Sequence, residues 1–316
     1  MPGGLLAVHA HPDDETLSTG ALLATWAAAG RPVTVVTCTR GERGEVIGTR
    51  LAHLEGHGPA LAAHRDRELG RALAALGVRD RGYLDTLPGS TSTRFEDSGM
   101  EWVGTGRAGS PDEIPPGAFV AAGLEEAAER LARVIRARRP DVVVTYEPDG
   151  GYGHPDHVRA HEVTQWAVTF AASGPDDDRP AFAVPVVLWA AQGRLALRRG
   201  LQALRGDAVL AALGSLRAGL ELPDPTAELP SVAVPDDELD LAVDVLPVRD
   251  RVLGALRAHV TQVQAVRAID DEPALVACYA LSNRALAPML PTETYRRGTG
   301  GSGEDIVWPV GVRPVA

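Results

Sequence analysis

The chain has 316 residues, 45% of them hydrophobic and 23% charged, so it can bury a large core and is not a disordered protein. Its formal net charge of −11 repels phosphate backbones and anionic lipids, so we expect neither nucleic acid nor a membrane surface as a partner. Two distant cysteines in apolar contexts, Cys38 and Cys278, are expected to be buried free thiols, as in a reducing compartment. The N-terminus has no signal-peptide or membrane-span pattern, and we expect a cytoplasmic protein.

Strands and helices alternate along the first two thirds of the chain. In chain order, we predict a strand at 4–10, a helix at 17–29, a strand at 32–39, a helix at 60–76, a weak strand at 82–84, a helix at 119–137, a strand at 141–146, a helix at 157–171 and a strand at 184–189. Such alternation predicts an α/β fold with a mostly parallel sheet and helices on both faces. Three segments interrupt it: a Gly-, Ser- and Pro-rich loop at 86–118, a connector at 173–181 and a Pro- and Asp-rich stretch at 222–238.

Histidines and carboxylates concentrate in two short segments that each follow a predicted strand. The segment HAHPDDE (9–15) follows the first strand, and YGHPDH (152–157) follows the strand at 141–146. Ligands of open parallel sheets bind outside the carboxyl ends of the strands, so both segments face one crevice if the two strands are neighbours. No GxGxxG motif follows the first strand, which argues against a dinucleotide-binding oxidoreductase.

The two segments hold the donor set of a catalytic metal site. Such a zinc site takes three nitrogen or oxygen ligands from the protein and keeps one position open for water. His11, Asp14 and His157 can supply that set. Asp13 is then an unused carboxylate beside the bound water, which is the position of a general base.

The remaining pair in the second segment suits oxyanion stabilisation. A protonated His154 can donate a hydrogen bond to an oxyanion, and Asp156 can keep that imidazole charged because a nearby anion raises a histidine pKa. Each segment also has a plain structural interpretation. Acids in PDDE suit a helix N-terminus, and HPDH suits a turn. Two such clusters at two strand ends favour the metal site.

The motifs AHPDDE (10–15) and HPDH (154–157) resemble those of the LmbE-like, PIG-L-type N-acetylglucosaminyl deacetylase family. Within that family the chain is most similar to the deacetylases of mycothiol biosynthesis, at 35–48 (VVTCTRGERGEVIG), 97–100, 142–157, 258–263 and 281–288. The resemblance implies hydrolysis of the N-acetyl group of N-acetylglucosaminyl-inositol, a small glycoside, to glucosaminyl-inositol and acetate. It implies Zn²⁺ as cofactor, with Fe²⁺ compatible with the same ligands.

The same resemblance implies a Rossmann-like domain. We expect this domain at 1–172, carrying both motifs, and a smaller C-terminal α/β portion at 173–316 that completes the sheet and the substrate pocket. The implied metal ligands are His11, Asp14 and His157. Asp13 is implied as general base and then as the acid that protonates the leaving amine, and His154 as the partner of the oxyanion. Asp156 would orient His154, and Tyr152 would assist at the intermediate or in substrate binding.

Four further positions match residues that contact sugar or inositol hydroxyls in the family: Arg65, Asp97, Glu45 and Met100. Arg65 also suits surface ion pairs with Asp66 and Glu68, and Asp97 also suits a turn. The remaining histidines receive no catalytic role. We expect His9 in the core, His161 on the helix surface or behind the metal ligands, and no catalytic function for His53, His57, His64 and His259.

Two other functions are compatible with the sequence. A mycothiol S-conjugate amidase of the same family would use the same metal core on the amide between glucosamine and an acylated cysteine. Ser18 and the context of 38–48 favour the mycothiol-biosynthesis deacetylase over this amidase. Deacetylation of another N-acetylglucosamine derivative by the same family is a further alternative. A non-catalytic sugar- or metal-binding module on this fold is the second alternative, and the presence of both Asp13 and His154 argues against it. The sequence carries no signal for oligomeric state or for closure of 86–118 over a substrate.

Overall fold

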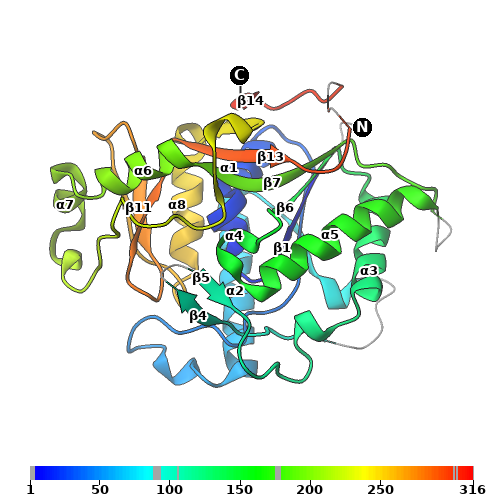
Figure 1. The fold of residues 1–316 in the computed structure, drawn as a ribbon, viewed down its shortest axis with the longest axis horizontal. Coiled ribbons are helices and arrows are strands. Elements are labelled where there is room, and N and C mark those ends of the chain that lie inside the picture. The colour runs from blue at the N-terminus through cyan, green and yellow to red at the C-terminus, as the bar shows by residue number, and fades with distance from the viewer. Residues whose placement is uncertain are drawn as a thin grey trace.

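A nine-stranded sheet forms the centre of the computed structural model, which describes residues 4–87, 94–104, 107–174, 179–301, 303 and 305–315 (Figure 1). Eight strands run in the order β14-β9-β13-β7-β6-β1-β2-β3, and β8 pairs with β7. Their bounds are β1 (Leu5–His9), β2 (Val33–Thr37), β3 (Asp80–Tyr83), β6 (Val142–Tyr146), β7 (Val186–Gly193), β8 (Ala233–Val234), β9 (Leu241–Asp244), β13 (Thr292–Arg297) and β14 (Val312–Pro314). The pairs from β7 to β3 are parallel, whereas β13, β9 and β14 add antiparallel pairs.

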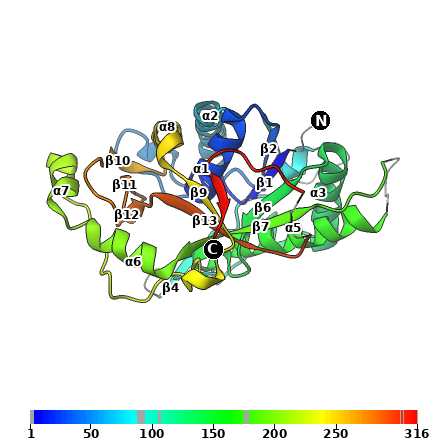
Figure 2. The same cartoon turned by 90° about the horizontal axis from the view of Figure 1, so that it is seen from above.

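Helices cover both faces of this sheet, as predicted. One face carries α1 (Asp14–Ala28), α2 (Gly58–Leu76) and α8 (Arg249–Ala258), and the other carries α3 (Leu124–Arg138) and α5 (Pro155–Ser173). Figure 2 shows α2 and α8 on one side of the sheet and α5 on the other. Successive side chains of β1 point to opposite faces of the sheet, and both faces are apolar. Leu5 belongs to the core under α1, and Leu6 belongs to the core under α3.

The remaining elements lie around the sheet. A three-stranded sheet of β10 (Gln264–Ala268), β11 (Ala277–Ala280) and β12 (Leu286–Met289) lies with α6 (Arg194–Ala203) and α7 (Asp207–Leu213) on the left of Figure 1. Strand β4 (Glu101–Gly104) pairs antiparallel with β5 (Arg107–Gly109), and α4 (Gly150–Gly153) precedes α5. The two paired strands lie in the predicted loop at 86–118, of which 88–93 and 105–106 are outside the described residues.

Several boundaries differ from the predicted ones for physical reasons. Helix α1 begins at Asp14 and not at residue 17, because the acids of the first motif form its first turn. Helix α3 begins at Leu124, since a short 3₁₀ turn at Phe119–Ala121 occupies the start of the predicted helix. Cys38 and Cys278 are both buried and free, as predicted. Among the described residues, no helix is both long and apolar enough to cross a membrane.

The fold places the two motifs together. Strand β1 pairs with β2 on one side and with β6 on the other, all parallel, with Ala7 opposite both Val35 and Val144. The chain order of strands reverses between β1 and β6, and a crevice opens at the carboxyl ends of such a pair. The segment 9–15 follows β1 and the segment 152–157 follows β6 by way of α4. The two motifs therefore follow neighbouring strands, as the prediction of one common crevice requires.

Candidate metal centre

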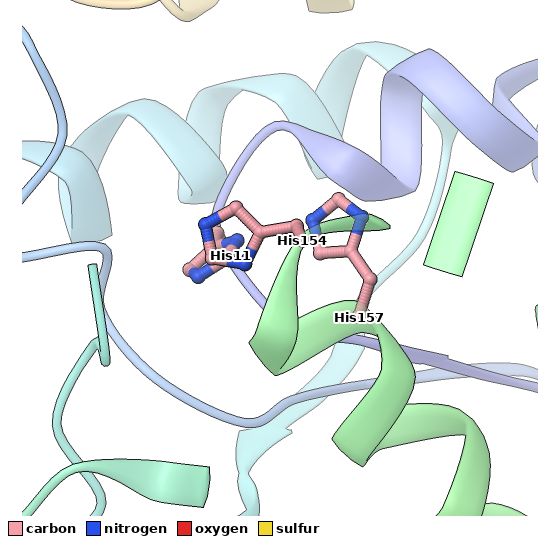
Figure 3. Close-up of side chains that lie close together, drawn as sticks. All are labelled: His11, His154 and His157. Carbon is pink, nitrogen blue, oxygen red and sulfur yellow. The ribbon is translucent and has the colours of Figure 1, made fainter. Parts of the chain in front are cut away.

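Three buried histidines gather at the N-terminal end of α5. His11 lies in the β1–α1 connection, His154 precedes α5, and His157 lies in its first turn. Figure 3 shows their three rings side by side, with centroids 4.7 Å apart for His11 and His154 and 4.8 Å apart for His154 and His157. One nitrogen from each ring lies within 4.8 Å of the others, which is a spacing that can hold a metal ion.

Asp14 lies between two of these rings. Its Oδ2 is 3.3 Å from Nδ1 of His11 and 3.4 Å from Nε2 of His157. The same oxygen accepts a hydrogen bond from the His11 backbone N–H at 2.9 Å, which fixes the carboxylate in the first turn of α1. Burial opposes the charged form, but His157 and His11 outweigh it and hold the pKa of Asp14 well below its usual range. The predicted ligands His11, Asp14 and His157 are therefore brought together around a charged carboxylate.

His157 carries the atom that best fits a cation. Its Nδ1 lies 3.0 Å from the carbonyl oxygen of Gly150 and donates to it, so Nε2 is the nitrogen left to face a cation. This Nε2 is buried without a hydrogen-bond partner among the described residues. Unpaired buried nitrogens are costly in a folded protein, and coordination would satisfy this one. The donor set of two imidazoles and one carboxylate fits a divalent metal.

Asp156 contacts His11, contrary to the predicted pairing with His154. Its Oδ2 lies 3.1 Å from Nε2 of His11, and it also accepts the backbone N–H of Ser98 at 2.9 Å. The second oxygen accepts the Ser98 hydroxyl at 2.5 Å. Asp156 lies in the first turn of α5 while His154 is the N-cap, so their side chains leave the helix in different directions. The carboxylate therefore fixes Nε2–H on His11 and directs Nδ1 toward Asp14.

The surroundings of His154 favour its neutral form, whereas the role expected from the sequence uses a protonated imidazole. Burial, followed by the neighbouring His11 and His157, holds the pKa of His154 well below its usual value. Its Nδ1 accepts a hydrogen bond from the Asp156 backbone N–H at 3.1 Å, so the ring proton lies on Nε2. A neutral imidazole in this tautomer still donates one hydrogen bond from Nε2.

Asp13 lies beside the cluster in an unusual conformation. Its backbone has φ 123° and ψ −32°, a region that residues other than glycine rarely adopt. Burial raises the pKa of Asp13 to about 6, while Arg65 opposes this rise. Nη2 of Arg65 lies 3.0 Å from Oδ1 of Asp13. A carboxyl that titrates near this pH is suited to both accepting and returning a proton at neutral pH.

Tyr152 borders the same cluster from α4. Its ring centroid lies 5.2 Å from that of His157 and 6.0 Å from that of His154, both in edge-on arrangements. Burial, with the charges of Asp14 and Asp13, raises the pKa of Tyr152 well above its usual value, so its hydroxyl is a donor. A cavity of about 250 Å³ is lined by Asp14, Tyr152 and His157 together with apolar side chains of α1 and α8.

The four predicted substrate-binding residues lie in different surroundings. Arg65 is only 3% exposed and does not form the surface ion pairs considered for it. Asp97 is buried, with Oδ1 accepting the Gly99 N–H at 2.8 Å and lying 3.8 Å from His11 Nε2. Glu45 is exposed and lines a separate surface hollow of about 480 Å³, and Met100 is half-buried next to β4. Their role in substrate binding stays a prediction.

The other histidines divide into core and surface residues. His9 is fully buried and bonds Thr19, which confirms its predicted place in the core. His161 is buried behind the site and bonds the backbone oxygen of Tyr146 at 2.8 Å. His259, given no catalytic function from sequence, is fully buried and lies 2.9 Å from Oε1 of Glu15. Glu15 belongs to the first motif and received no role of its own from the sequence, because only the structure shows that its carboxylate is fully buried.

Known proteins match this chain over most of its length. The family described as PIG-L, GlcNAc-PI de-N-acetylase, matches residues 6–168. A Kineococcus radiotolerans protein named 1D-myo-inositol 2-acetamido-2-deoxy-alpha-D-glucopyranoside deacetylase is 45% identical over 308 residues, covering 96% of this chain and 79% of that protein. A Nocardioides sp. protein of the same name is 41% identical over 305 residues, covering 95% and 93%. The crystal structure of the conserved protein TT1542 from Thermus thermophilus aligns with a TM-score of 0.46 and 21% identity, covering 82% of this chain and 79% of that one.

Proposed function

This chain belongs to the PIG-L family of GlcNAc-PI de-N-acetylases, and we propose that it hydrolyses the N-acetyl group of 1D-myo-inositol 2-acetamido-2-deoxy-α-D-glucopyranoside, here called acetylglucosaminyl-inositol. Relatives more than 40% identical over nearly the whole chain carry that activity in their names. The observation that carries the proposal is the buried position of Asp14, between His11 and His157 and next to Asp13, an acid outside the proposed ligand set. A metal-dependent amide hydrolase needs this set of groups.

The proposed ligands are Nδ1 of His11, Oδ2 of Asp14 and Nε2 of His157. Oδ2 of Asp14 lies within 3.4 Å of both imidazole nitrogens, while the opposite nitrogen of each ring is held by Asp156 or Gly150. Zinc suits two imidazoles and one carboxylate, and ferrous iron is compatible with them. When bound, such a cation supplies a Lewis acid for the amide carbonyl and a water with a pKa near 7.

The protein groups then carry the proton transfers. Asp13 accepts a proton from the attacking water while the oxygen of that water forms a bond to the carbonyl carbon. Nε2–H of His154 donates a hydrogen bond to the oxyanion, and the hydroxyl of Tyr152, whose ring lies 6.0 Å from that of His154, is a second donor. Asp13 returns the proton to the amide nitrogen as the carbon–nitrogen bond breaks. The products are acetate and the free amine.

A second candidate is the mycothiol S-conjugate amidase of the same family. The observation in its favour is the cavity beside His157, whose volume of about 250 Å³ exceeds what an acetyl group fills. Its lining includes apolar side chains that suit a larger acyl group, among them Leu17, Val252 and Met289. The two candidates share the metal ligands and differ in the acyl group that leaves as the acid.

A direct comparison of two substrates tests the proposal. One metal-replete preparation receives acetylglucosaminyl-inositol or a mycothiol S-conjugate at equal concentration, and free amine release is followed with a chelated sample as control. Faster, chelator-sensitive release from the acetylated sugar supports the deacetylase. Faster release from the S-conjugate supports the amidase, and release from neither contradicts both assignments.

A further inference from the structure

We infer that Glu15 and His259 form a positioning pair for the base Asp13, and that the segment 258–263 holds His259 in place for it. The inference rests on the proposed function, because that function gives Asp13 its role. It accounts for a segment that the sequence singled out and that the metal ligands leave unexplained. It also accounts for the positive φ of Asp13.

The carboxylate of Glu15 holds the backbone of Asp13. Oε2 of Glu15 accepts the Asp13 N–H at 2.9 Å. Because Asp13 is the N-cap of α1, its N–H has no partner within the helix, and Glu15 supplies one. Asp13 has φ 123°, and a residue other than glycine keeps such a conformation only where its surroundings impose it. The bond to Glu15 is therefore one of the contacts that impose it.

His259 fixes the other oxygen of Glu15. Its Nε2 donates to Oε1 of Glu15 at 2.9 Å, and the Thr16 hydroxyl donates to the same oxygen at 2.5 Å. Glu15 and His259 both have no exposed surface. A buried carboxylate is costly unless its oxygens are hydrogen-bonded. The donors from Asp13, Thr16 and His259 satisfy both oxygens and hold the carboxylate of Glu15 in one orientation.

The loop after α8 brings His259 to this position. His259 is the C-cap of α8, and Thr261 in the same loop donates its backbone N–H at 3.0 Å and its hydroxyl at 2.6 Å to the buried Glu68 of α2. The carbonyl oxygen of Thr261 accepts the N–H of Ile47 at 2.9 Å. These bonds tie 258–263 to α2 and to the loop after β2. None of them involves Glu15, so the loop is anchored independently of the residue that it supports.

The pair acts on catalysis through the position of the Asp13 carboxylate. A change in the backbone angles of Asp13 moves its side chain, and a base displaced by about 1 Å loses on the order of 10²-fold in rate. Neither Glu15 nor His259 lines the cavity beside His157, so we expect neither to contact the substrate. The loss of the pair should therefore lower kcat and leave KM nearly unchanged.

The test compares His259→Phe and His259→Gln with Thr261→Val on acetylglucosaminyl-inositol, with metal content and unfolding temperature measured in parallel. We expect His259→Phe to lower kcat by about 10- to 100-fold, with KM changed less than about threefold and metal content unchanged. His259→Gln should recover part of kcat, because its amide keeps an N–H donor for Glu15.

Thr261→Val is the matched control from the same loop. It removes a buried hydroxyl but none of the donors to Glu15, and it leaves the backbone bonds of the loop in place. It should lower the unfolding temperature while kcat stays within about threefold of the wild type. An equal loss of kcat in Thr261→Val and His259→Phe would overturn the inference, because loop stability alone would then explain both.

A double variant tests whether His259 acts through Asp13. On an Asp13→Asn background, His259→Phe should lower the residual kcat by less than about threefold. A full loss on that background would overturn the inference. So would a KM raised by about tenfold or more, and so would lost metal, since the pair would then act on Asp14. If His259→Phe does not fold, His259→Gln takes its place in each comparison, with a smaller loss of kcat expected.

Unfolding measurements without substrate separate this inference from the proposed function, which an inactive wild type would contradict. Glycine adopts a positive φ more readily than alanine. Asp13→Gly should therefore unfold about 2 °C or more above Asp13→Ala while Glu15 imposes that φ. With Glu15→Gln added to both variants, one acceptor oxygen faces three donors, and the gap should narrow by about half or more. A gap that Glu15→Gln leaves unchanged would overturn the positioning role.

Discussion

Nε2 of His11 lies 3.1 Å from Oδ2 of Asp156, although 145 residues separate the two in the chain. Ser98 closes the arrangement by donating both its backbone N–H and its hydroxyl to the same carboxylate. A carboxylate on the far nitrogen of a metal-binding imidazole fixes the tautomer and raises the basicity of the ligand. Asp156 therefore acts on the proposed metal site through His11.

This relationship predicts a loss of metal affinity in Asp156→Asn. We expect the affinity for zinc to fall by about 10- to 100-fold, because the His11 ring would lose its charged partner. Competition with a chromophoric chelator measures the change. Asp149→Asn is the matched control, since Asp149 is exposed in the turn before α4. Unchanged zinc affinity together with lost activity would indicate that Asp156 serves His154 after all.

Replacing the proposed base should separate catalysis from metal binding. Asp13→Asn keeps the size of the side chain but cannot accept the water proton, so we expect activity to fall by about 10²-fold or more. Metal content should stay at the wild-type level, because Asp13 is not among the proposed ligands. His157→Ala and Asp14→Ala should instead lose metal, and full activity in Asp13→Asn would remove its assigned role.

The turn before α5 offers a test of how closely the site is packed. A Cβ on Gly150 would lie 2.8 Å from Cβ of His157 and from the backbone nitrogen of Val158. Gly150→Ala should therefore displace His157 and reduce both zinc affinity and activity. Gly151→Ala is the control, because Gly151 has a similarly positive φ but no atom within 4 Å of the added carbon. Equal effects of the two variants would show that backbone strain, and not the clash with His157, causes the loss.

The sequence predicts much of this fold for identifiable reasons. β-Branched runs such as 142–146 mark the buried parallel strands, and glycines such as Gly77 mark helix ends. The two motifs follow neighbouring strands, so spacing and topology together predict a common crevice. The antiparallel additions β9, β13 and β14 were not predicted, because short strands at a sheet edge lack a strong periodic pattern.

Side-chain partners within the site could not be read from spacing. Asp156 is two residues from His154 but contacts His11, since side-chain direction at a helix N-terminus depends on the turn that precedes it. Glu15 and His259 meet across 244 positions, and tertiary packing alone brings them together. Arg65 resembles a surface residue by its charged neighbours in α2, yet it faces the interior.

A buried acid outside the proposed ligand set gives the protein a pH-dependent stability. Burial raises the pKa of Glu293 from 4.5 to about 7, although Tyr295 and the backbone N–H groups of Ala21 and Leu22 oppose the rise. The folded state thus holds a proton that the unfolded state releases at lower pH. The resulting stabilisation is complete below about pH 4.5 and is lost as pH rises through 7.

Glu293→Gln should remove that dependence. We expect the difference in free energy of unfolding, variant minus wild type, to increase by on the order of 2 kcal/mol when the pH is raised from 5 to 8. Urea unfolding at both pH values measures the gap, with linear extrapolation to water. Because the same variant is compared at two pH values, any pH-independent effect of the amide side chain on the hydrogen bonds to α1 cancels. A gap that is the same at both pH values would show that Glu293 does not titrate in this range.

Metal reconstitution tests the central claim most directly. The protein is stripped with a chelator, titrated with Zn²⁺ and assayed for acetate release from acetylglucosaminyl-inositol, alongside Asp14→Ala treated in the same way. We predict that the stripped wild type is inactive, that activity returns and saturates near one ion per chain, and that Asp14→Ala does not recover at that ratio. Full acetate release by the stripped wild type, or equal recovery by Asp14→Ala, would contradict a catalytic metal held by His11, Asp14 and His157.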